Sequence, residues 1–160
     1  MKQKIFEEIK EIIKKEKLDI DINQNEEKII KEFQDKVDWH WISEHQKLSE
    51  SFIKEFQDKI DWCRISMYQI LSESFIREFQ DKVNWEYISD HQKLSESFIR
   101  EFQDKVYWNC ISYSQILSLN FIKKFQDKIE WELINKNKKI IKTKKLQNMI
   151  NQEILIQELK

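Results

Sequence analysis

The sequence predicts an all-α solenoid of five two-helix repeats, each 23 residues long, with a capping helix at each end. The motif Phe-Gln-Asp-Lys returns in strict register, starting at Phe33, Phe56, Phe79, Phe102 and Phe125. A tryptophan and an isoleucine recur at the same 23-residue spacing, beginning at Trp39 and Ile42. A fixed period of this length is typical of solenoids and repeat arrays.

Each repeat is predicted to contain two short helices, which we call helix A and helix B. In the second repeat, apolar residues with helical spacing lie at Leu48, Phe52, Ile53, Phe56 and Ile60. The step from Ile60 to Trp62 breaks that spacing, so one continuous helix would scatter the apolar residues around its surface. We therefore expect helix A near 50–59 and helix B near 62–69, with the same pattern in every repeat.

The helix starts are marked by capping residues. Ser49 and Asp61 stand where N-caps of helices A and B are expected, whereas Tyr107 takes the cap position in the fourth repeat and should cap poorly. Helices this short are marginal in water by themselves, so their apolar side chains must be buried against neighbouring repeats. The residues expected in this core are Phe52, Ile53, Phe56, Trp62 and Ile65.

The two ends of the chain depart from the repeat. Residues 1–25 and 139–160 carry apolar residues at helical spacing, and we expect them to be helices that cap the array at 26–138 within a single domain. Solenoids need such caps to cover the open ends of the stack. The alternative is that these ends are separate interaction helices.

Two polar residues recur in helix B, and we expect both to be structural. The small serine can let helices approach closely in a chain without glycine, and the glutamine can satisfy backbone groups between repeats. The recurring residues are Ser43, Ser66, Ser89 and Ser112, and Gln46, Gln69, Gln92 and Gln115.

The repeats differ mainly in helix B, at one, two, five and six positions after the tryptophan. These positions share one face of a helix. Aromatic, arginine and histidine side chains on a scaffolded surface are typical of a recognition site, although drift on an exposed face is the alternative. The candidate partner-binding residues are His40, Trp41, His45, Arg64, Tyr68, Tyr87, His91, Asn109 and Tyr113.

A longer period of 46 residues overlies the repeat. Polar pairs alternate with apolar ones, in the order Glu44 and Lys47, Met67 and Ile70, Asp90 and Lys93, Tyr113 and Ile116. Duplication of a two-repeat block explains this alternation. Packing of the second and fourth repeats against a dimer partner or a terminal helix explains it equally well.

Charge is distributed unevenly along the chain. Residues 26–131 hold 15 basic and 20 acidic residues, whereas residues 132–160 hold seven basic and three acidic residues. An acidic body repels a nucleic-acid backbone and suits a partner with a basic surface, such as a nucleic-acid-binding protein. The lysine run at 135–145 is more typical of a solvated helix face, although it could contact phosphates.

The composition argues against most catalytic classes. The chain has no glycine, which phosphate-cradling and dinucleotide-binding loops require. The spacing of His40 and His45 does not match a zinc-binding helix, and Cys63 and Cys110 are expected to be unpaired thiols. We expect no enzyme activity, cofactor or metal. With neither a membrane-length apolar run nor a signal peptide in the sequence, we expect a cytoplasmic protein.

The phrase LSESFIREFQDKVNWEYIS resembles short repeats of the pattern LSExFIxEFxDKVxWxxIS. Such repeats occur in uncharacterised proteins of giant DNA viruses, phages and prophage-bearing bacteria, and the resemblance covers residues 26–137. It transfers no catalytic residue, and it implies a viral or mobile-element origin. Small proteins from such sources often inhibit host defence, as anti-CRISPR proteins do, so the resemblance implies a place in the host cytoplasm and a defence nuclease as a possible target.

These observations lead to a first hypothesis and two alternatives. The first is a non-enzymatic repeat protein that binds a protein partner through the variable helix B residues and the acidic body. The second is RNA binding through the helix B aromatics and the C-terminal lysines, in the manner of proteins that read one base per repeat. The third is a self-assembling structural protein, for which a homodimer is the simplest form.

Overall fold

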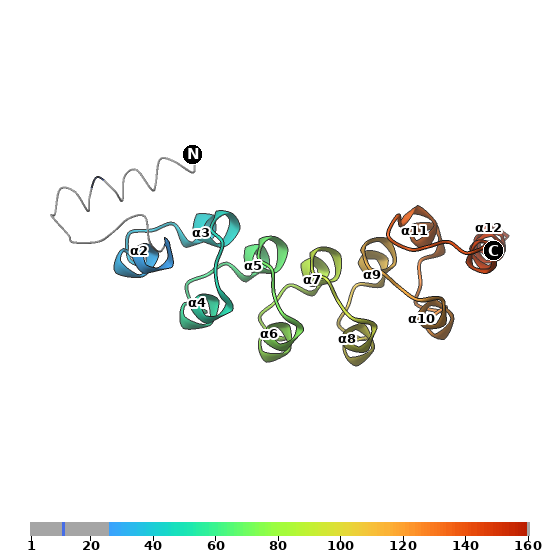
Figure 1. Cartoon of the computed structure of the whole chain (residues 1–160), viewed down its shortest axis with the longest axis horizontal. Helices are drawn as coiled ribbons and strands as arrows, with labels where there is room; N and C mark the ends of the chain where they lie inside the picture. The colour runs from blue at the N-terminus through green and yellow to red at the C-terminus, as the bar shows by residue number, and fades with distance from the viewer. Residues whose placement is uncertain (1–10, 12–25, 160) are drawn as a thin grey trace. The chain divides into compact units, whose positions relative to one another are not determined.

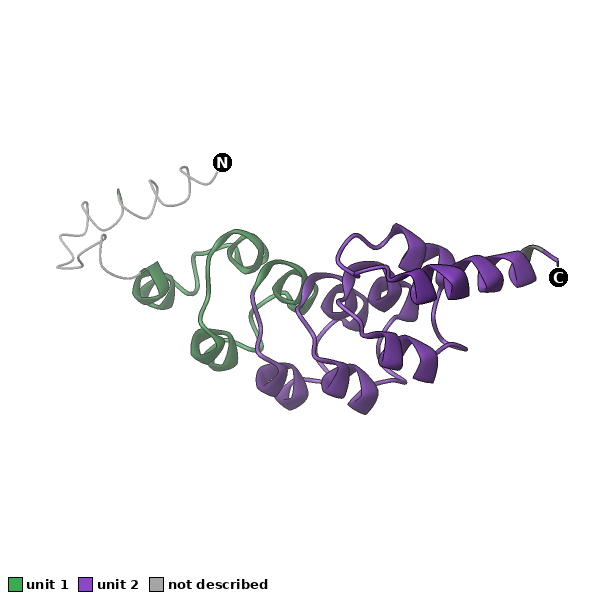
Figure 2. Cartoon of the chain, turned by 45° about the vertical axis from the view of Figure 1, so that its right-hand side comes forward, with its two compact units in different colours: residues 1–69 green, residues 70–160 purple. Residues whose placement is uncertain are grey.

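The computed structural model of the chain describes residue 11 and residues 26–159, which form eleven α-helices and no strand (Figure 1). Regularly spaced repeat helices pack against one another, so the predicted all-α repeat solenoid is confirmed. The chain falls into two compact units, residues 1–69 and residues 70–160 (Figure 2). The predicted N-terminal capping helix over 1–25 lies outside the described residues, except for Glu11.

Helices A and B alternate along the chain. Unit 1 contains α2 (Glu26–Glu32), α3 (Trp39–His45), α4 (Glu50–Glu55) and α5 (Trp62–Tyr68). Unit 2 contains α6 (Glu73–Glu78), α7 (Trp85–His91), α8 (Glu96–Glu101), α9 (Trp108–Ser114), α10 (Leu119–Lys124), α11 (Trp131–Lys136) and α12 (Lys144–Glu158). In unit 2 the A helices α6, α8 and α10 form one layer and the B helices α7, α9 and α11 form the other (Figures 1 and 2).

The predicted helix starts are confirmed by their caps. The Ser49 hydroxyl accepts a hydrogen bond from the Phe52 N–H at 3.2 Å. The Asp61 carboxylate accepts from the N–H groups of Cys63 and Arg64 at 3.0 and 3.2 Å. Tyr107 makes no side-chain cap to α9, as its phenol ring predicts.

The predicted C-terminal end of helix A is wrong. Helix α4 ends at Glu55, not near residue 59, because Phe56 leaves the helical conformation at φ −106° and ψ 25°. The Phe56 carbonyl then accepts from the Lys59 N–H at 2.9 Å, which closes a turn over residues 56–59. The Gln-Asp-Lys part of the repeated motif therefore lies in this turn, outside the helix.

The lysine of that turn joins one repeat to the repeat before it. Lys59 Nζ donates to Gln34 Oε1 at 2.8 Å and lies 3.2 Å from Asp35 Oδ1. The same ammonium group lies 5.9 Å from the centroid of the Trp39 ring. Lys105 makes the equivalent contacts in unit 2. Within each unit a copy of the motif thus pairs with the preceding copy, which explains why its residues recur in strict register.

The core matches the prediction at four of the expected positions and differs at the tryptophan. Phe52, Ile53, Phe56 and Ile65 are buried, whereas Trp62 is only half-buried. The indole N–H of Trp62 donates to the Gln57 carbonyl at 2.9 Å, which keeps the ring beside the surface turn. An indole can bury most of its apolar body while its N–H end stays at a polar boundary, and this explains the correction.

The recurring glutamines bridge successive repeats, as predicted. Gln115 Oε1 accepts from the Leu94 N–H at 3.2 Å, and Nε2 donates to the carbonyls of Ser89 and Gln92 at 2.9 and 2.8 Å. Gln69 makes the same set of bonds in unit 1. One buried amide therefore satisfies three backbone groups of the preceding repeat.

The recurring serines are fully buried and have a second structural use that their size did not predict. Ser43 Oγ donates to the Trp39 carbonyl at 2.7 Å and accepts from the Asp61 N–H at 2.9 Å. Ser89 makes the equivalent pair of bonds in unit 2. The serine therefore joins its own helix to the start of the next helix B.

The C-terminal capping helix begins later than predicted. Asn137 ends α11, and its side chain donates to the carbonyls of Ser112 and Gln115 and accepts from the Lys139 N–H. These bonds keep the following residues out of a helix until Thr143 caps α12.

Only part of the predicted apolar stripe of the capping helix is buried. Leu146 and Ile150 are buried, and α12 packs against α11. Ile141, Leu155 and Leu159 are exposed, although the apolar pattern of a capping helix is expected to cover the end of the array. Ile141 precedes the helix, Leu155 lies in its last turn and Leu159 follows it.

Candidate functional site

The variable residues of α3 and α5 in unit 1, and of α7 and α9 in unit 2, are accessible except for Ser114, and we call these accessible residues the helix-B face of each unit. In α3, Ile42 and Ser43 are fully buried between variable residues that are not. None of the predicted partner-binding residues is buried. The exposed ones are His40, His45, Tyr68, His91, Asn109 and Tyr113, and the half-buried ones are Trp41, Arg64 and Tyr87.

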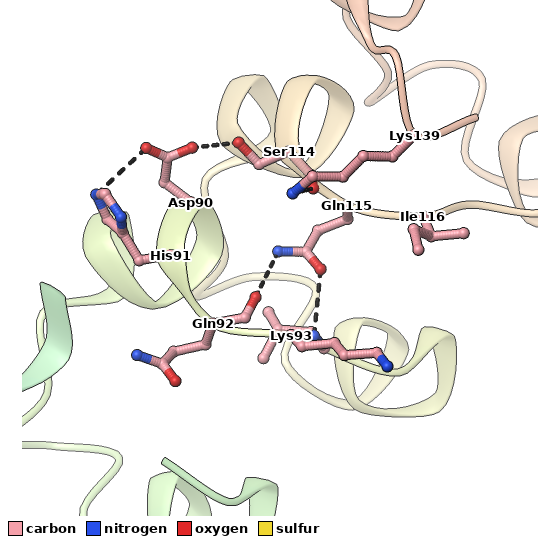
Figure 3. Close-up of a pocket in the computed structure, with 9 residues that line it drawn as sticks. Asp90, His91, Gln92, Lys93, Ser114, Gln115, Ile116 and Lys139 are labelled. Carbon is pink, nitrogen blue, oxygen red and sulfur yellow. Dashed lines mark hydrogen bonds and ion pairs between the residues drawn. The ribbon is translucent and has the colours of Figure 1, made fainter. Parts of the chain in front are cut away.

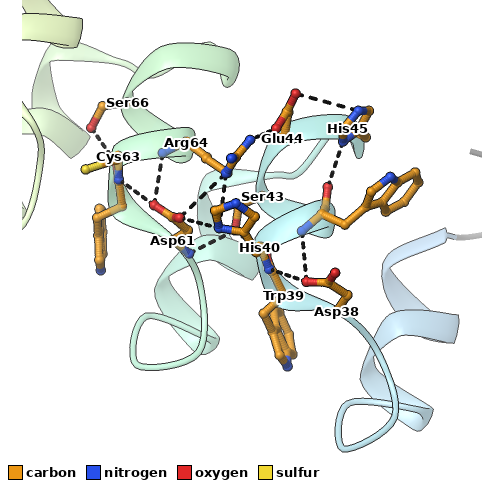
Figure 4. Close-up of polar contacts among 12 residues, drawn as sticks. Asp38, Trp39, His40, Ser43, Glu44, His45, Asp61, Cys63, Arg64 and Ser66 are labelled. Atoms are coloured by element: carbon orange, nitrogen blue, oxygen red, sulfur yellow. Dashed lines mark hydrogen bonds and ion pairs between the residues drawn. The ribbon is translucent and has the colours of Figure 1, made fainter. Parts of the chain in front are cut away.

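In unit 1 the helix-B face brings together two of the predicted residues, His40 of α3 and Arg64 of α5 (Figure 4). His40 Nδ1 lies 2.7 Å from Asp61 Oδ2, and Arg64 Nε lies 3.1 Å from the same His40 nitrogen. A ring nitrogen either carries a proton or accepts one, so Nδ1 can donate to Asp61 or accept from Arg64, not both at once. This group can therefore rearrange its hydrogen bonds when a charged partner approaches.

Glu44 extends this cluster along α3 to the remaining predicted residues. Its carboxylate forms an ion pair with the Arg64 guanidinium, and its Oε1 lies 3.6 Å from His45 Nε2. The His45 ring stacks on the Trp41 ring, with centroids 4.7 Å apart and planes inclined by 5°. Unit 1 therefore presents an aromatic pair beside a network of charged groups.

Sequence reasoning does not single out the two carboxylates that hold this network. The sequence predicts Asp61 only as a cap, yet one of its oxygens caps α5 while the other contacts His40. Glu44 lies at the fifth position after Trp39, which is one of the variable positions. This variable position could have identified Glu44 as a site residue. Nothing in the sequence indicates that Asp61 also contacts His40.

In unit 2 the helix-B face has fewer charged contacts. His91 Nε2 lies 3.4 Å from Asp90 Oδ2, and the Ser114 hydroxyl donates to the other oxygen of Asp90. The rings of Tyr87 and His91 lie 6.0 Å apart at 53°. Tyr113 is 53% exposed.

A hollow of about 370 Å³ adjoins this part of the helix-B face (Figure 3). Lys139 reaches into its wall from the segment before α12 and donates to the Ser114 carbonyl at 2.6 Å. The hollow offers a carboxylate, an imidazole and ammonium groups beside an exposed isoleucine, so it is suited to receive a polar side chain of a partner. Its lining includes Asp90, His91, Lys93, Ser114, Ile116 and Lys139.

The remaining chemistry of the described part of the chain is limited. Among its residues, no group of three His, Cys, Asp or Glu side chains is placed to hold a metal ion. Cys63 and Cys110 are not joined by a disulfide, and burial, followed by the charges of Asp90 and Glu86, raises the pKa of Cys110. Within residues 26–159, no helix has the length and apolar character needed to cross a membrane.

No family model, curated protein or solved structure matches this chain. The residues of the helix-B face therefore carry the functional conclusion.

Proposed function

We propose that this protein is a non-enzymatic helical-repeat protein that binds a protein partner through the helix-B face. The observation that carries this proposal is that the repeated isoleucine and serine of α3, α5, α7 and α9 are buried, whereas every variable residue of these four helices except Ser114 is accessible. Buried repeated residues maintain the scaffold, so the residues that differ between repeats are those that a partner can distinguish.

The charges and aromatic groups of the helix-B face favour a partner with a basic surface. Helices α3, α5, α7 and α9 together carry three carboxylates and one guanidinium. Tyrosine, tryptophan and arginine are the residues that most often dominate binding energy, and charge complementarity orients the encounter. Trp41, Tyr68 and Tyr87 are therefore the expected anchors.

The resemblance to viral and phage repeats supports a narrower form of the proposal. In that form the partner is a nucleic-acid-binding protein of a host defence complex, such as a CRISPR effector, and binding in the host cytoplasm inhibits it. The acidic balance of residues 26–131 suits the basic channel of such a protein.

The proposal is tested by capturing partners from host-cell lysate after nuclease treatment, with Trp41→Ala/Tyr68→Ala/Tyr87→Ala beside the unchanged protein. We expect the unchanged protein to retain one protein in fixed proportion and the triple variant to lose it, while circular dichroism shows equal helicity. Tyr107→Ala is the matched control, because it removes an exposed ring from a cap position outside the helix-B face.

Three outcomes would overturn the proposal. Loss of helicity in the triple variant would place these rings in the core. Retention that depends on nucleic acid and is lost in the triple variant would favour the RNA-binding alternative. Recovery of the protein alone would favour self-assembly.

A further inference from the structure

The A helices are joined by ion pairs that repeat along the chain. In unit 2, Arg77 donates from Nε and Nη2 to the two carboxylate oxygens of Glu101, each at 2.8 Å. In unit 1, Lys31 Nζ pairs with one carboxylate oxygen, Oε1, of Glu55. The base of one helix A therefore meets an acid in the next helix A, 24 residues further on.

The last helix A reverses this charge. Lys124 stands at the position that Glu55, Glu78 and Glu101 occupy in the preceding repeats. Arg100 corresponds to Arg77, so the repeat geometry puts Lys124 where Arg100 would otherwise meet a carboxylate. Within residues 26–159, neither Arg100 nor Lys124 makes an ion pair.

The end of the array does not by itself explain this reversal. Glu96 accepts from the Ser118 N–H at 2.5 Å, and the next glutamate of this series is replaced by Leu119. That replacement is expected, because no further helix A follows to provide a serine. Lys124 is different, since its expected partner Arg100 is present in the preceding helix.

Further lysines gather at the start of α12. Lys144 and Lys145 lie in its first turn, which contains no acidic residue. Cations are unfavourable there, because the helix dipole is positive at its N-terminus. Lys145 also lies within hydrogen-bonding reach of Lys123, and this contact, followed by the charge of Lys145, lowers the pKa of Lys123. Positive charges are therefore close together at this end of unit 2.

We infer that a terminal basic patch at the end of unit 2 binds the phosphate backbone of nucleic acid. The patch consists of Arg100, Lys123, Lys124, Lys144 and Lys145. It belongs to α8, α10 and α12, whereas the helix-B face of unit 2 belongs to α7 and α9, so the two sites are independent.

A nucleic-acid backbone fits this patch better than an acidic protein segment does. Each strand of a duplex carries one phosphate about every 3.4 Å along the helix axis, and the two strands together carry one charge about every 1.7 Å. Adjacent ammonium groups such as those of Lys123 and Lys145 match that density, and lysine serves as a point-charge ligand for phosphate. The patch makes no provision for reading bases, so we expect binding without sequence preference.

The test uses the full chain and a fluorescent single-stranded DNA of about 20 nucleotides and mixed sequence, followed by anisotropy across a salt series. A plot of log affinity against log salt concentration has a negative slope. Each lost phosphate contact makes this slope shallower by about 0.7 for a single strand. We therefore expect Lys123→Gln/Lys145→Gln to reduce the slope by about 1.4 and the affinity at 0.1 M salt by about 25-fold. Lys28→Gln/Lys47→Gln is the matched control, with the same charge change at exposed positions outside the patch, and it should bind as the unchanged protein does.

The inference fails if the unchanged protein shows no salt-dependent binding, or if the control variant loses as much affinity as the patch variant. Displacement by polyglutamate as effective as displacement by unlabelled DNA, at equal charge, would assign the patch to an acidic protein instead. The Trp41→Ala/Tyr68→Ala/Tyr87→Ala variant should bind DNA normally, so failure of the patch and failure of the helix-B face can be distinguished.

Discussion

Single buried amides hold successive repeats together. Gln115 provides one acceptor and two donors to backbone groups that neither α7 nor α9 satisfies by itself. The side chain is only 4% exposed, so water cannot readily replace it. An amide is suited to this position because it donates and accepts at the same site.

We expect Gln115→Leu to lower the free energy of unfolding by about 3 kcal/mol, because each buried group left unsatisfied costs about 1–3 kcal/mol. Urea denaturation followed by circular dichroism measures the loss. Gln152→Leu, at an exposed position of α12, should stay within about 0.5 kcal/mol of the unchanged protein. Equal losses in the two variants would show that the bridging bonds contribute nothing specific.

The ion pair between A helices should be visible in the pH dependence of stability. The hydrogen bond from Arg77 lowers the pKa of Glu101, and the charge of Arg77 acts in the same direction. The folded-state pKa lies below the unfolded value, so the pair stabilises the fold above the ordinary glutamate pKa of about 4.3 and loses this effect as the pH falls through the folded value.

Glu101→Gln should therefore lower stability at neutral pH and lose less of it on acidification between about pH 5 and pH 3. Thermal melts across this range measure the difference. Glu86→Gln, at an exposed position of α7, should follow the acid dependence of the unchanged protein. Parallel curves for Glu101→Gln and the unchanged protein would contradict the pair's contribution.

Recurrence in the sequence predicted the buried glutamines and serines, because a residue that bridges repeats must appear in each of them. It could not predict that Trp62 is half-buried, since a tryptophan at an apolar position gives no sign of where its N–H will bond. The second role of Asp61 depends on His40, which lies 21 residues earlier, and such a contact is set by tertiary packing.

At the scale of helices, side-chain N-caps mark the starts of α3 to α8, α10 and α12, whereas α9 and α11 begin without one. Ser49 and Asp61 can be identified from the sequence because their polar side chains precede apolar residues at helical spacing. The ends of the helices are less predictable. Helix α4 stops at Glu55, and the turn that follows carries Lys59, whose partners Gln34 and Asp35 belong to the preceding repeat.

Tyr107→Asp should supply the cap that α9 lacks and raise the free energy of unfolding by about 1 kcal/mol. The tyrosine is 46% exposed, so losing its ring removes only part of its apolar contact. Tyr107→Ala isolates that loss, and the cap contribution is the difference between the two variants in urea denaturation. No advantage of aspartate over alanine would show that the start of α9 does not depend on a side-chain cap.

The 46-residue alternation has a structural counterpart between helices. Glu44 pairs with Arg64, and Asp90 accepts from Ser114, so the acid of an odd-numbered repeat contacts helix B of the repeat that follows. These contacts give the acid at the fifth position after Trp39 and Trp85 a partner, although the partner lies two positions after Trp62 in one case and six positions after Trp108 in the other.

At the scale of the whole molecule, the charge pattern separates stability from binding. Acids and bases that recur in the repeats form ion pairs within each unit, and these pairs favour folding. Lys124 of the terminal basic patch is an exception to this pattern of ion pairs, because a glutamate at its position would form an ion pair with Arg100. A residue that gives up an available stabilising contact is a candidate for function, because functional sites often cost stability.

Lys124→Glu tests whether Lys124 lowers stability in favour of nucleic-acid binding, since it restores the residue found in the preceding repeats. We expect the introduced carboxylate to pair with Arg100 as Glu101 pairs with Arg77, with a gain in stability of up to about 1 kcal/mol at low salt. The gain should shrink as salt rises, because exposed pairs are screened. The same variant should lose DNA affinity at least as strongly as Lys123→Gln/Lys145→Gln, since it removes one cation, engages a second and adds a repulsive charge.

Lys124→Gln separates these effects, because it removes the cation without creating a partner for Arg100. We expect it to weaken DNA binding by about fivefold at 0.1 M salt and to leave stability nearly unchanged. If Lys124→Glu bound DNA as the unchanged protein does, the patch would not contact the backbone at this position. If it lost DNA binding without becoming more stable than Lys124→Gln, Arg100 would not be the partner that the repeat pattern assigns to this position.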